Sequence, residues 1–290
     1  MKKIYLLSTD HLEDSLWFHE EEDFRVAMNY VAIQAVCSPD VSVLAFVLMS
    51  NHVHFVLAGT RRDVEEFLKA FKQRYSLYLR RKYCFKEFLR DISVDVRLIP
   101  LGDEALERAI AYVQMNPVAA NICSHPSQYP WGTGSIFFNQ SVVAGKSVED
   151  FSGRALRQLL RSDSNVIPKG WNICDMGYLL PQSYVDVAFV EKCYRTPRRM
   201  NFFLQNSSKA RKRMESAERN LPSFRDQIIL TAIPDLCRSL FQKDGICDLS
   251  TIELSELLRQ IRFRFSADVK QIARVCSLPY AETVKLLDEI

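Results

Sequence analysis

Two short apolar runs, separated by only two polar residues, constrain the fold of this chain most strongly. Residues 41–49 are almost wholly apolar and too short for a stable helix, so they predict a buried β-strand. Ser50 and Asn51 then supply a turn, after which residues 52–57 return as a second strand. The sequence therefore predicts a β-hairpin that any fold of this chain has to contain.

The segments on either side of the hairpin alternate between strand and helix patterns. Three of them carry apolar residues at helical spacing, and short apolar runs mark two more strands. The resulting order, β-α-β-β-α-β-α, suits an α+β fold with an antiparallel sheet and helices packed on one face, the ferredoxin-like arrangement. The expected elements are a strand at 3–8, a short extended piece at 16–19, helices at 21–36, 62–82 and 103–115 (the last with Asp103 as N-cap), and a strand at 94–99.

The second hairpin strand carries two histidines two residues apart. Because side chains alternate between the faces of a strand, His52 and His54 point to the same face. Two imidazoles side by side can hold a single divalent metal ion. The alternative is a pair of solvated or hydrogen-bonded strand histidines with no metal between them, and the pair alone leaves both interpretations open.

The helix expected at 103–115 places a tyrosine, Tyr112, well off its buried stripe. Arg108 lies one turn before this tyrosine, and Asn116 lies one turn after it. Divalent cations accept imidazole and amide-oxygen ligands while leaving positions open for a phosphate oxygen, and a phenol can form a reversible phosphodiester link to the protein. The alternatives are a packing role for Tyr112 and, for Asn116, a cap on a new turn that begins at Pro117.

The charge is distributed unevenly, although the net charge is only +3. Residues 1–150 carry 16 Lys and Arg against 19 Asp and Glu, whereas residues 151–290 carry 22 against 16. Within the acidic half, basic residues gather between 69 and 90, which points to a polyanion partner, with a solvated helix face as the alternative. The residues expected to contact DNA here are Lys69, Lys72, Arg74, Arg80, Arg81 and Lys82, with Arg108 beside the tyrosine.

Three separated motifs of this chain together resemble one protein family. They are residues 49–57 around the histidine pair, residues 111–120 around Tyr112 and its Asn-Pro step, and Tyr129-Pro130-Trp131. In this order and at these distances they are similar to the single-tyrosine HUH transposases, in particular to the branch of REP-associated tyrosine transposases. The resemblance covers residues 1–135, and the HUH nuclease fold of that family agrees with the element order predicted above.

The resemblance implies a metal-dependent, transposase-type DNA strand transferase. His52 and His54 would then be metal ligands, Asn116 a third ligand, and Tyr112 the nucleophile that forms a 5′-phosphotyrosine. The implied metal is Mg²⁺ or Mn²⁺, which would polarise the scissile phosphate, and the implied substrate is single-stranded or hairpin DNA. Covalent storage of the bond energy would let a second 3′-hydroxyl reverse the step without ATP.

Two features of the chain depart from the family, and three tyrosines compete with Tyr112. Ser50 stands where the family has proline, and residues 84–95 are charged and apolar where the family has a glycine-rich segment, which puts the DNA contacts of that segment in question. The competing tyrosines are Tyr75 and Tyr78, which fall on the inner stripe of their helix and are expected in the core, and Tyr83, which lies among basic residues and could stack on a base.

From residue 223 onward the pattern is helical, and the pattern of residues 266–287 resembles a helix-turn-helix. A helical hairpin that only packs on 223–265 is the alternative. We expect a DNA-binding module, because a nuclease that cuts hairpins gains site selection from one. Its expected core is Ile272, Ala273, Cys276, Leu278 and Val284, and the side chains expected to face a groove are Tyr280, Thr283 and Lys285.

The chain is expected to fall into three parts: a nuclease domain at 1–135, an irregular and helical connecting region at 136–222, and a helical DNA-binding domain at 223–290. No apolar run reaches the roughly 20 residues that span a bilayer, and the N-terminal apolar stretch ends at Leu7, too early for export. The eight cysteines show no metal-binding spacing and are expected as free thiols in the cytoplasm. We expect a monomer or homodimer with no membrane partner and no small-molecule substrate.

Two other functions would use the same residues. One is a catalytically silent DNA-binding regulator descended from such an enzyme, and the other is a replication-initiator or relaxase nuclease. The presence of every named site residue favours an active enzyme. The single positioned tyrosine with its Asn-Pro motif favours the transposase branch over the initiators and relaxases.

Overall fold

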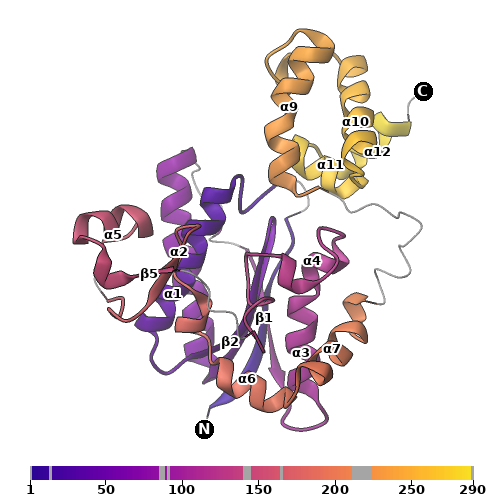
Figure 1. Ribbon diagram of the computed structural model, residues 1–290. Helices are drawn as coiled ribbons and strands as arrows, with labels where there is room; N and C mark the ends of the chain where they lie inside the picture. The colour runs from indigo at the N-terminus through magenta and orange to yellow at the C-terminus, as the bar shows by residue number, and fades with distance from the viewer. Residues whose placement is uncertain are drawn as a thin grey trace.

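The computed structural model describes residues 2–12, 15–84, 89, 92–139, 145–163, 166–210 and 224–288, and Figure 1 shows their course. Its strands are β1 (Lys3–Thr9), β2 (Ser42–Met49), β3 (His52–Gly59), β4 (Val94–Ile99), β5 (Gly145–Ser147) and β6 (Asn172–Cys174). Its helices are α1 (Glu21–Cys37), α2 (Arg61–Tyr83), α3 (Ala105–Gln114), α4 (Asn116–Ala119), α5 (Gly153–Leu160), α6 (Val187–Tyr194), α7 (Pro197–Gln205), α9 (Asp226–Phe241), α10 (Thr251–Phe265), α11 (Val269–Cys276) and α12 (Tyr280–Asp288).

Strands β1 to β4 form one antiparallel sheet in the order β2-β3-β1-β4. The predicted order of the first seven elements, β-α-β-β-α-β-α, is confirmed, and β2 and β3 are the predicted hairpin. The extended piece expected at 16–19 is not a strand. Its backbone instead holds the hairpin turn, because the N–H groups of Trp17 and Phe18 donate to the Ser50 carbonyl at 2.8 and 3.2 Å.

Helices cover both faces of this sheet, not one face as the sequence suggested. Helices α1 and α2 lie on one side, while α3, α4 and α7 lie on the other (Figure 1). The alternation of β3 fixes the two sides, since Phe55 packs its ring against Phe67 and Phe71 of α2, whereas His54 faces Tyr112 of α3. A strand that is buried on both faces does not alternate between apolar and polar residues, so its sequence does not tell whether one face or both are covered.

The long helix α2 forms the predicted amphipathic helix. It begins at a capping box, in which the Thr60 hydroxyl and the Asp63 carboxylate satisfy each other's backbone N–H groups. Its inner residues bury their rings against α1 and the sheet, with Phe67, Phe71 and Tyr75 almost fully buried. Burial of one such ring contributes about 1.5–3 kcal/mol, so this side of the sheet anchors the fold.

The region after α4 packs on the same core as the sheet. Residues 129–139 contain no helix or strand, and residues 140–144 lie outside the described part. Strand β5 then runs to Ser147, and α5 spans Gly153–Leu160. Gly132 is required where this stretch crosses β2, since a Cβ there would lie 2.7 Å from the Phe46 carbonyl oxygen.

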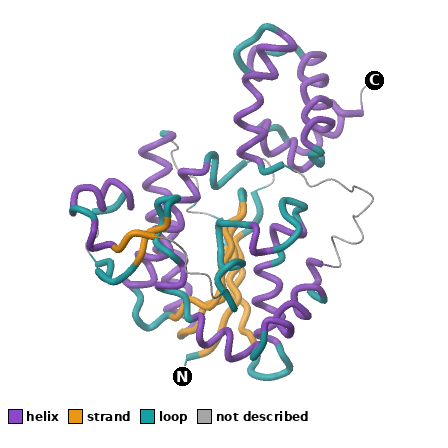
Figure 2. The backbone as a smooth tube through the Cα atoms, in the orientation of Figure 1, coloured by secondary structure: helices purple, strands orange, loops and turns teal. Residues whose placement is uncertain are grey.

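Helices α9 to α12 bury a core of their own, from Ile229 to Leu286. Figure 2 shows these helices grouped apart from the strands, beyond one end of the sheet. They meet the rest of the molecule through Gln227, whose side chain donates to the Phe18 carbonyl at 2.8 Å, and through the Arg225–Glu21 ion pair. Within the described residues, no helix is both long and apolar enough to cross a membrane.

Candidate active site

His52 and His54 share one face of β3, as predicted, and both are buried. The Nδ1 atom of His52 lies 2.8 Å from the Asn51 side-chain oxygen, and the Nδ1 atom of His54 lies 2.7 Å from the Ser8 hydroxyl. In each ring the Nε2 atom is buried without a hydrogen-bond partner. Each imidazole is therefore held in place through one nitrogen while the other stays available.

A third histidine, His11, completes this cluster. It follows β1, and Ser8 of that strand stands directly opposite His54 in the register of the sheet. The His11 ring stacks on His52 with centroids 3.6 Å apart and lies 6.4 Å from His54. One ring nitrogen from each of the three histidines lies within 4.8 Å of those of the other two, which is close enough for a shared metal ion. Sequence reasoning missed His11, although the pairing of the first strand with the histidine strand could have pointed to it.

Burial keeps the two strand histidines neutral. Burial lowers the pKa of His54 to about 3, and the positive charges of Lys209 and His11 add to the effect. Burial likewise lowers the pKa of His52 well below its ordinary value. Neutral imidazole is the form that binds a metal ion.

Tyr112 lies beside the histidines. Helix α3 packs across β2 and β3, and its Tyr112 ring meets the His54 ring edge to face with centroids 5.6 Å apart. The ammonium of Lys209 lies over the Tyr112 ring, 4.8 Å from its centre. Burial raises the pKa of the Tyr112 phenol, so the hydroxyl keeps its proton at neutral pH. Lys209 is a second site residue that sequence reasoning missed, because it lies almost one hundred residues after the tyrosine.

Asn116 is the first residue of α4, the short helix that continues from α3. Its side-chain nitrogen donates to the carbonyls of Tyr112 and Val113 at 2.9 and 3.2 Å. The amide therefore turns its oxygen toward His54. There it raises the pKa of that histidine, against the larger lowering by burial, although it forms no hydrogen bond of ordinary geometry with Nε2. The interpretation of Asn116 as a cap is wrong, because Met115 is the N-cap of α4 and the Asn116 side chain donates to two carbonyls of α3.

The start of α3 differs from the prediction. Asp103 is not the N-cap, because the helix begins at Ala105 and Glu104 precedes it. Residues Gly102, Asp103 and Glu104 all have positive φ, at 103°, 50° and 58°, so they form a tight turn and not a helix entry. The position of Tyr112 is unaffected, because it lies in the second half of the helix.

The competing tyrosines occupy the other side of the sheet. Tyr75 and Tyr78 are buried as predicted, and their hydroxyls donate to the Trp17 carbonyl and the Asp23 carboxylate. Tyr83 also donates to Asp23, at 2.9 Å. All three hydroxyls therefore have protein partners and lie on the α2 side, away from the histidines.

The third sequence motif, Tyr129-Pro130-Trp131, bonds to β2, the edge strand of the histidine hairpin. The Tyr129 hydroxyl donates to the Leu48 carbonyl at 2.7 Å, and the Leu48 N–H donates to the Trp131 carbonyl at 2.9 Å. The Trp131 ring stacks on Phe24 of α1. Both aromatic residues are buried, so this motif supports the position of the histidine strand and has no access to a ligand.

The basic residues of α2 separate into groups with different environments. Lys72 is 8% exposed and donates to the Ile92 carbonyl, and Lys82 forms ion pairs with Glu20, Glu22 and Asp23. These two lysines bind protein partners, which corrects the expectation that they contact DNA. The remaining residues line two different hollows on either side of the helix, Lys69 and Arg80 beside β4, and Arg74 and Arg81 beside α1. Residues 85–88, 90 and 91 of the segment at 84–95 lie outside the described part.

The other residues expected to contact DNA are mostly on the surface. Arg108 is exposed and pairs with Glu104, while Tyr280 and Lys285 of α12 are exposed. Thr283 is fully buried and its hydroxyl donates to the Pro279 carbonyl, so it cannot face a groove. The buried side of α12 is thus formed by Thr283 and Leu286, with the expected core residue Val284 only partly buried. The rest of that expected core is found: Ile272, Ala273 and Cys276 are buried, and Leu278 packs against them.

Comparison with known proteins gives one similar structure. No protein-family profile matches this chain, and no curated protein matches its sequence. Among solved structures, the chain is similar to a REP-associated tyrosine transposase bound to a REP hairpin. The two chains share 13% sequence identity with a TM-score of 0.33, and the similarity covers 45% of this chain and 76% of the other.

Proposed function

We propose that this chain is a metal-dependent DNA strand transferase of the REP-associated tyrosine transposase type, acting on single-stranded or hairpin DNA. The observation that carries the proposal is the convergence of buried, unpartnered imidazole nitrogens from His52 and His54 beside a half-buried tyrosine, Tyr112. Separate motifs, far apart in the sequence, supply these groups, and their convergence at one place supports a functional site.

The donor atoms fit a divalent metal ion. His52 and His54 would bind it through their Nε2 atoms, with His11 and the Asn116 oxygen as further ligands, and the bonds from Nδ1 to Asn51 and Ser8 would hold the two strand imidazoles in orientation. When bound, the ion would polarise the scissile phosphate and stabilise the charge that develops on it. Imidazole nitrogens suit Mn²⁺ better than Mg²⁺, which prefers oxygen ligands, so we propose Mn²⁺ as the better activator.

The residues around the histidines would carry out the transfer. The Tyr112 oxygen would attack the phosphorus of the scissile phosphodiester, forming a 5′-phosphotyrosine and releasing a 3′-hydroxyl. Lys209 would stabilise the negative charge near the Tyr112 ring, which it faces at 4.8 Å. Asn116 would position the tyrosine, since its amide is bonded to the Tyr112 carbonyl.

The same proposal assigns roles to the larger parts of the chain. Residues 1–135 would form the HUH nuclease domain with its ferredoxin-like arrangement, residues 136–222 would connect it, and residues 223–290 would bind DNA through a helix-turn-helix. A three-residue turn, from Ser277 to Pro279, between α11 and α12 supports the last assignment. Tyr280 and Lys285 would face the DNA, and Lys69, Arg74, Arg80, Arg81 and Arg108 would contact its backbone.

A covalent-adduct experiment tests the proposal. Full-length protein is incubated with Mn²⁺ and a pool of hairpin DNAs with randomised flanks, labelled at the 3′ end, and the products are separated on a denaturing gel. The wild-type protein should retain label, and Tyr112→Phe should retain none because the ring stays but the nucleophile is gone. Tyr83→Phe is the matched control and should still form the adduct. Binding without an adduct in any condition would favour a silent regulator instead.

A further inference from the structure

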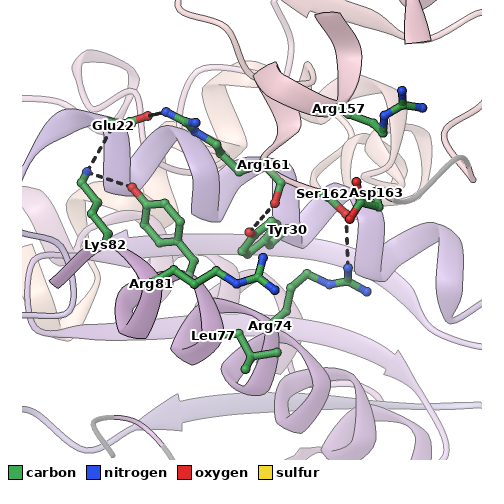
Figure 3. Close-up of a pocket in the computed structure, with 11 residues that line it drawn as sticks. Glu22, Tyr30, Arg74, Leu77, Arg81, Lys82, Arg157, Arg161, Ser162 and Asp163 are labelled. Carbon is green, nitrogen blue, oxygen red and sulfur yellow. Dashed lines mark hydrogen bonds and ion pairs between the residues drawn. The ribbon is translucent and has the colours of Figure 1, made fainter. Parts of the chain in front are cut away.

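A second basic site lies on the side of the sheet opposite the histidines. A cavity of about 890 Å³ opens between α1, α2 and α5 (Figure 3). Arg74 and Arg81 reach it from α2, and Arg157 and Arg161 reach it from α5 and its end. Four guanidinium groups from two helices, far apart in the sequence, thus line one cavity.

Positive groups outnumber carboxylates in this cavity, because among the described residues five basic side chains line it against two carboxylates, Glu22 and Asp163. Glu22 pairs with Arg161 at 2.7 Å and with Lys82 at 3.1 Å, so its negative charge is already neutralised. In the described part of the chain, no ion pair joins Arg74, Arg81 or Arg157 to a carboxylate. Positive groups that outnumber their counter-charges attract an anion, and guanidinium groups match the geometry of phosphate oxygens.

The cavity is held in shape before any ligand binds. The Tyr30 hydroxyl donates to the Arg161 carbonyl at 2.8 Å, which fixes the end of α5 against α1. Arg74 lies over the Tyr30 ring, 5.8 Å from its centre, and its Nε atom is buried without a hydrogen-bond partner. The Arg74 guanidinium also donates to the Ser162 hydroxyl at 3.5 Å, so the ring and this bond preorganise it for a charged acceptor.

The cavity and the histidine site lie at the same end of the sheet. The N–H groups of Trp17 and Phe18 bond to Ser50, which precedes the histidine strand, and the chain then runs directly into α1 with Glu22 at the cavity. A few residues of chain therefore separate the two sites. A polynucleotide held at the histidines can continue over this end and place a phosphate in the cavity.

We propose that this cavity binds a phosphate group of the DNA strand that flanks the reacting phosphodiester. The inference rests on the proposed function for the identity of the ligand, but the site itself follows from its own residues. A free nucleotide or inorganic phosphate presents the same chemistry. The experiment therefore has separate arms for DNA and for free phosphate.

The test compares two arginines of one helix. Arg157→Glu reverses a charge inside the cavity, and Arg154→Glu reverses one on the same exposed helix outside it. Affinity for a hairpin with a long single-stranded flank is measured at several salt concentrations in a Tyr112→Phe background, so that no strand is cleaved. Arg157→Glu should weaken binding about tenfold, the loss of one charge-assisted hydrogen bond, and reduce the log–log salt slope by about 0.7. Arg154→Glu should change neither.

Further arms separate the possible failures. Adduct formation on a hairpin without a flank, measured with Tyr112 present, should be equal in Arg157→Glu and wild type, because that DNA does not reach the cavity. Equal DNA affinity and slope for the two arginine variants would overturn the inference. Binding of inorganic phosphate or ATP that Arg157→Glu abolishes, with unchanged DNA affinity, would also overturn it in favour of a free ligand. Absence of any adduct would contradict the proposed function. The salt slopes of the two arginine variants would still test the phosphate site, because they are measured without cleavage.

Discussion

Two clusters of buried polar side chains, one on each face of the four-stranded sheet, differ in whether their groups have partners within the protein. On the α2 face, the Asp23 carboxylate is fully buried and accepts from the Tyr78 hydroxyl at 2.8 Å and from the Lys82 ammonium at 2.7 Å. On the α3 face, His52 and His54 are buried just as deeply, but their Nε2 atoms have no partner. One cluster is complete within the protein, and the other is not.

This difference supports a structural role for the Asp23 cluster and a ligand-binding role for the histidine cluster. A buried donor or acceptor without a partner costs about 1–3 kcal/mol, so most buried polar groups are hydrogen-bonded. The Asp23 cluster follows that rule and joins α1 to α2. The histidine cluster departs from it at two neighbouring atoms, and a ligand that binds both would remove the cost.

Removal of the Asp23 carboxylate should have the largest effect on stability. Asp23→Ala would remove the acceptor of the Tyr78 hydroxyl and of the backbone N–H groups at positions 19 and 20, which together costs about 3–5 kcal/mol at about 1–3 kcal/mol for each group, although Lys82 keeps two other carboxylates. The free energy of unfolding, measured in urea, should fall by that amount, while Glu21→Ala, which loses only an exposed pair with Arg225, should change it by less than about 1 kcal/mol. A small loss for Asp23→Ala would mean that the two clusters do not differ.

Removal of a strand histidine should instead weaken metal binding. His54→Ala should weaken Mn²⁺ binding at least about 100-fold, since even loss of a residue that only supports a metal ligand costs 10- to 100-fold. Isothermal titration of the full chain with Mn²⁺ measures this change. His125→Ala is the matched control, because His125 is exposed and bonds only to its neighbour Ser127, and its affinity should equal that of the wild type. Equal affinity for His54→Ala and His125→Ala would end the metal proposal.

The cation over the nucleophile should matter less. Lys209→Ala removes the ammonium that lies 4.8 Å from the Tyr112 ring, an interaction of roughly 0.5–1 kcal/mol, so the rate of adduct formation should fall about two- to fivefold. Lys146→Ala, which removes an exposed lysine of β5, should leave the rate unchanged. A Lys209→Ala rate equal to that of the wild type would exclude Lys209 from the site.

The smallest expected effect is a pH dependence from the structural face. The Arg161 guanidinium, helped by Lys82, holds the pKa of Glu22 at about 2, below its usual 4.5. Glu22 therefore contributes stability that is fully present above pH 4.5 and is lost as the pH falls toward 2. Urea unfolding between pH 5 and pH 3 should show a steeper loss for the wild type than for Glu22→Gln. Parallel profiles would mean that Glu22 is not held in its ionised form by these partners.

The sequence predicted the elements better than the way they pack. Apolar spacing located the histidine hairpin, α2 and the helix of Tyr112, because these patterns are local. It placed helices on one face only, because β2 and β3 are apolar on both sides and give no sign of which helix covers which. His11 lies at the site because β1 pairs with the histidine strand. Lys209 lies there because the chain returns to Tyr112 almost one hundred residues later. Thr283 is buried and its hydroxyl donates to the Pro279 carbonyl just before the helix, because α12 packs through this side on its own core, which spacing along one helix does not reveal.

The central claim is that Tyr112, beside the partnerless histidines, forms the covalent link to DNA. Mass spectrometry of the trypsin-digested adduct tests it most directly, since cleavage after Arg108 and Lys146 yields one peptide that contains Tyr112. The account predicts a nucleotide joined through a 5′-phosphate to Tyr112 in that peptide. The buried Tyr129 of the same peptide should be unmodified, because its hydroxyl is bonded to Leu48. A nucleotide on any other residue of the chain would contradict the account.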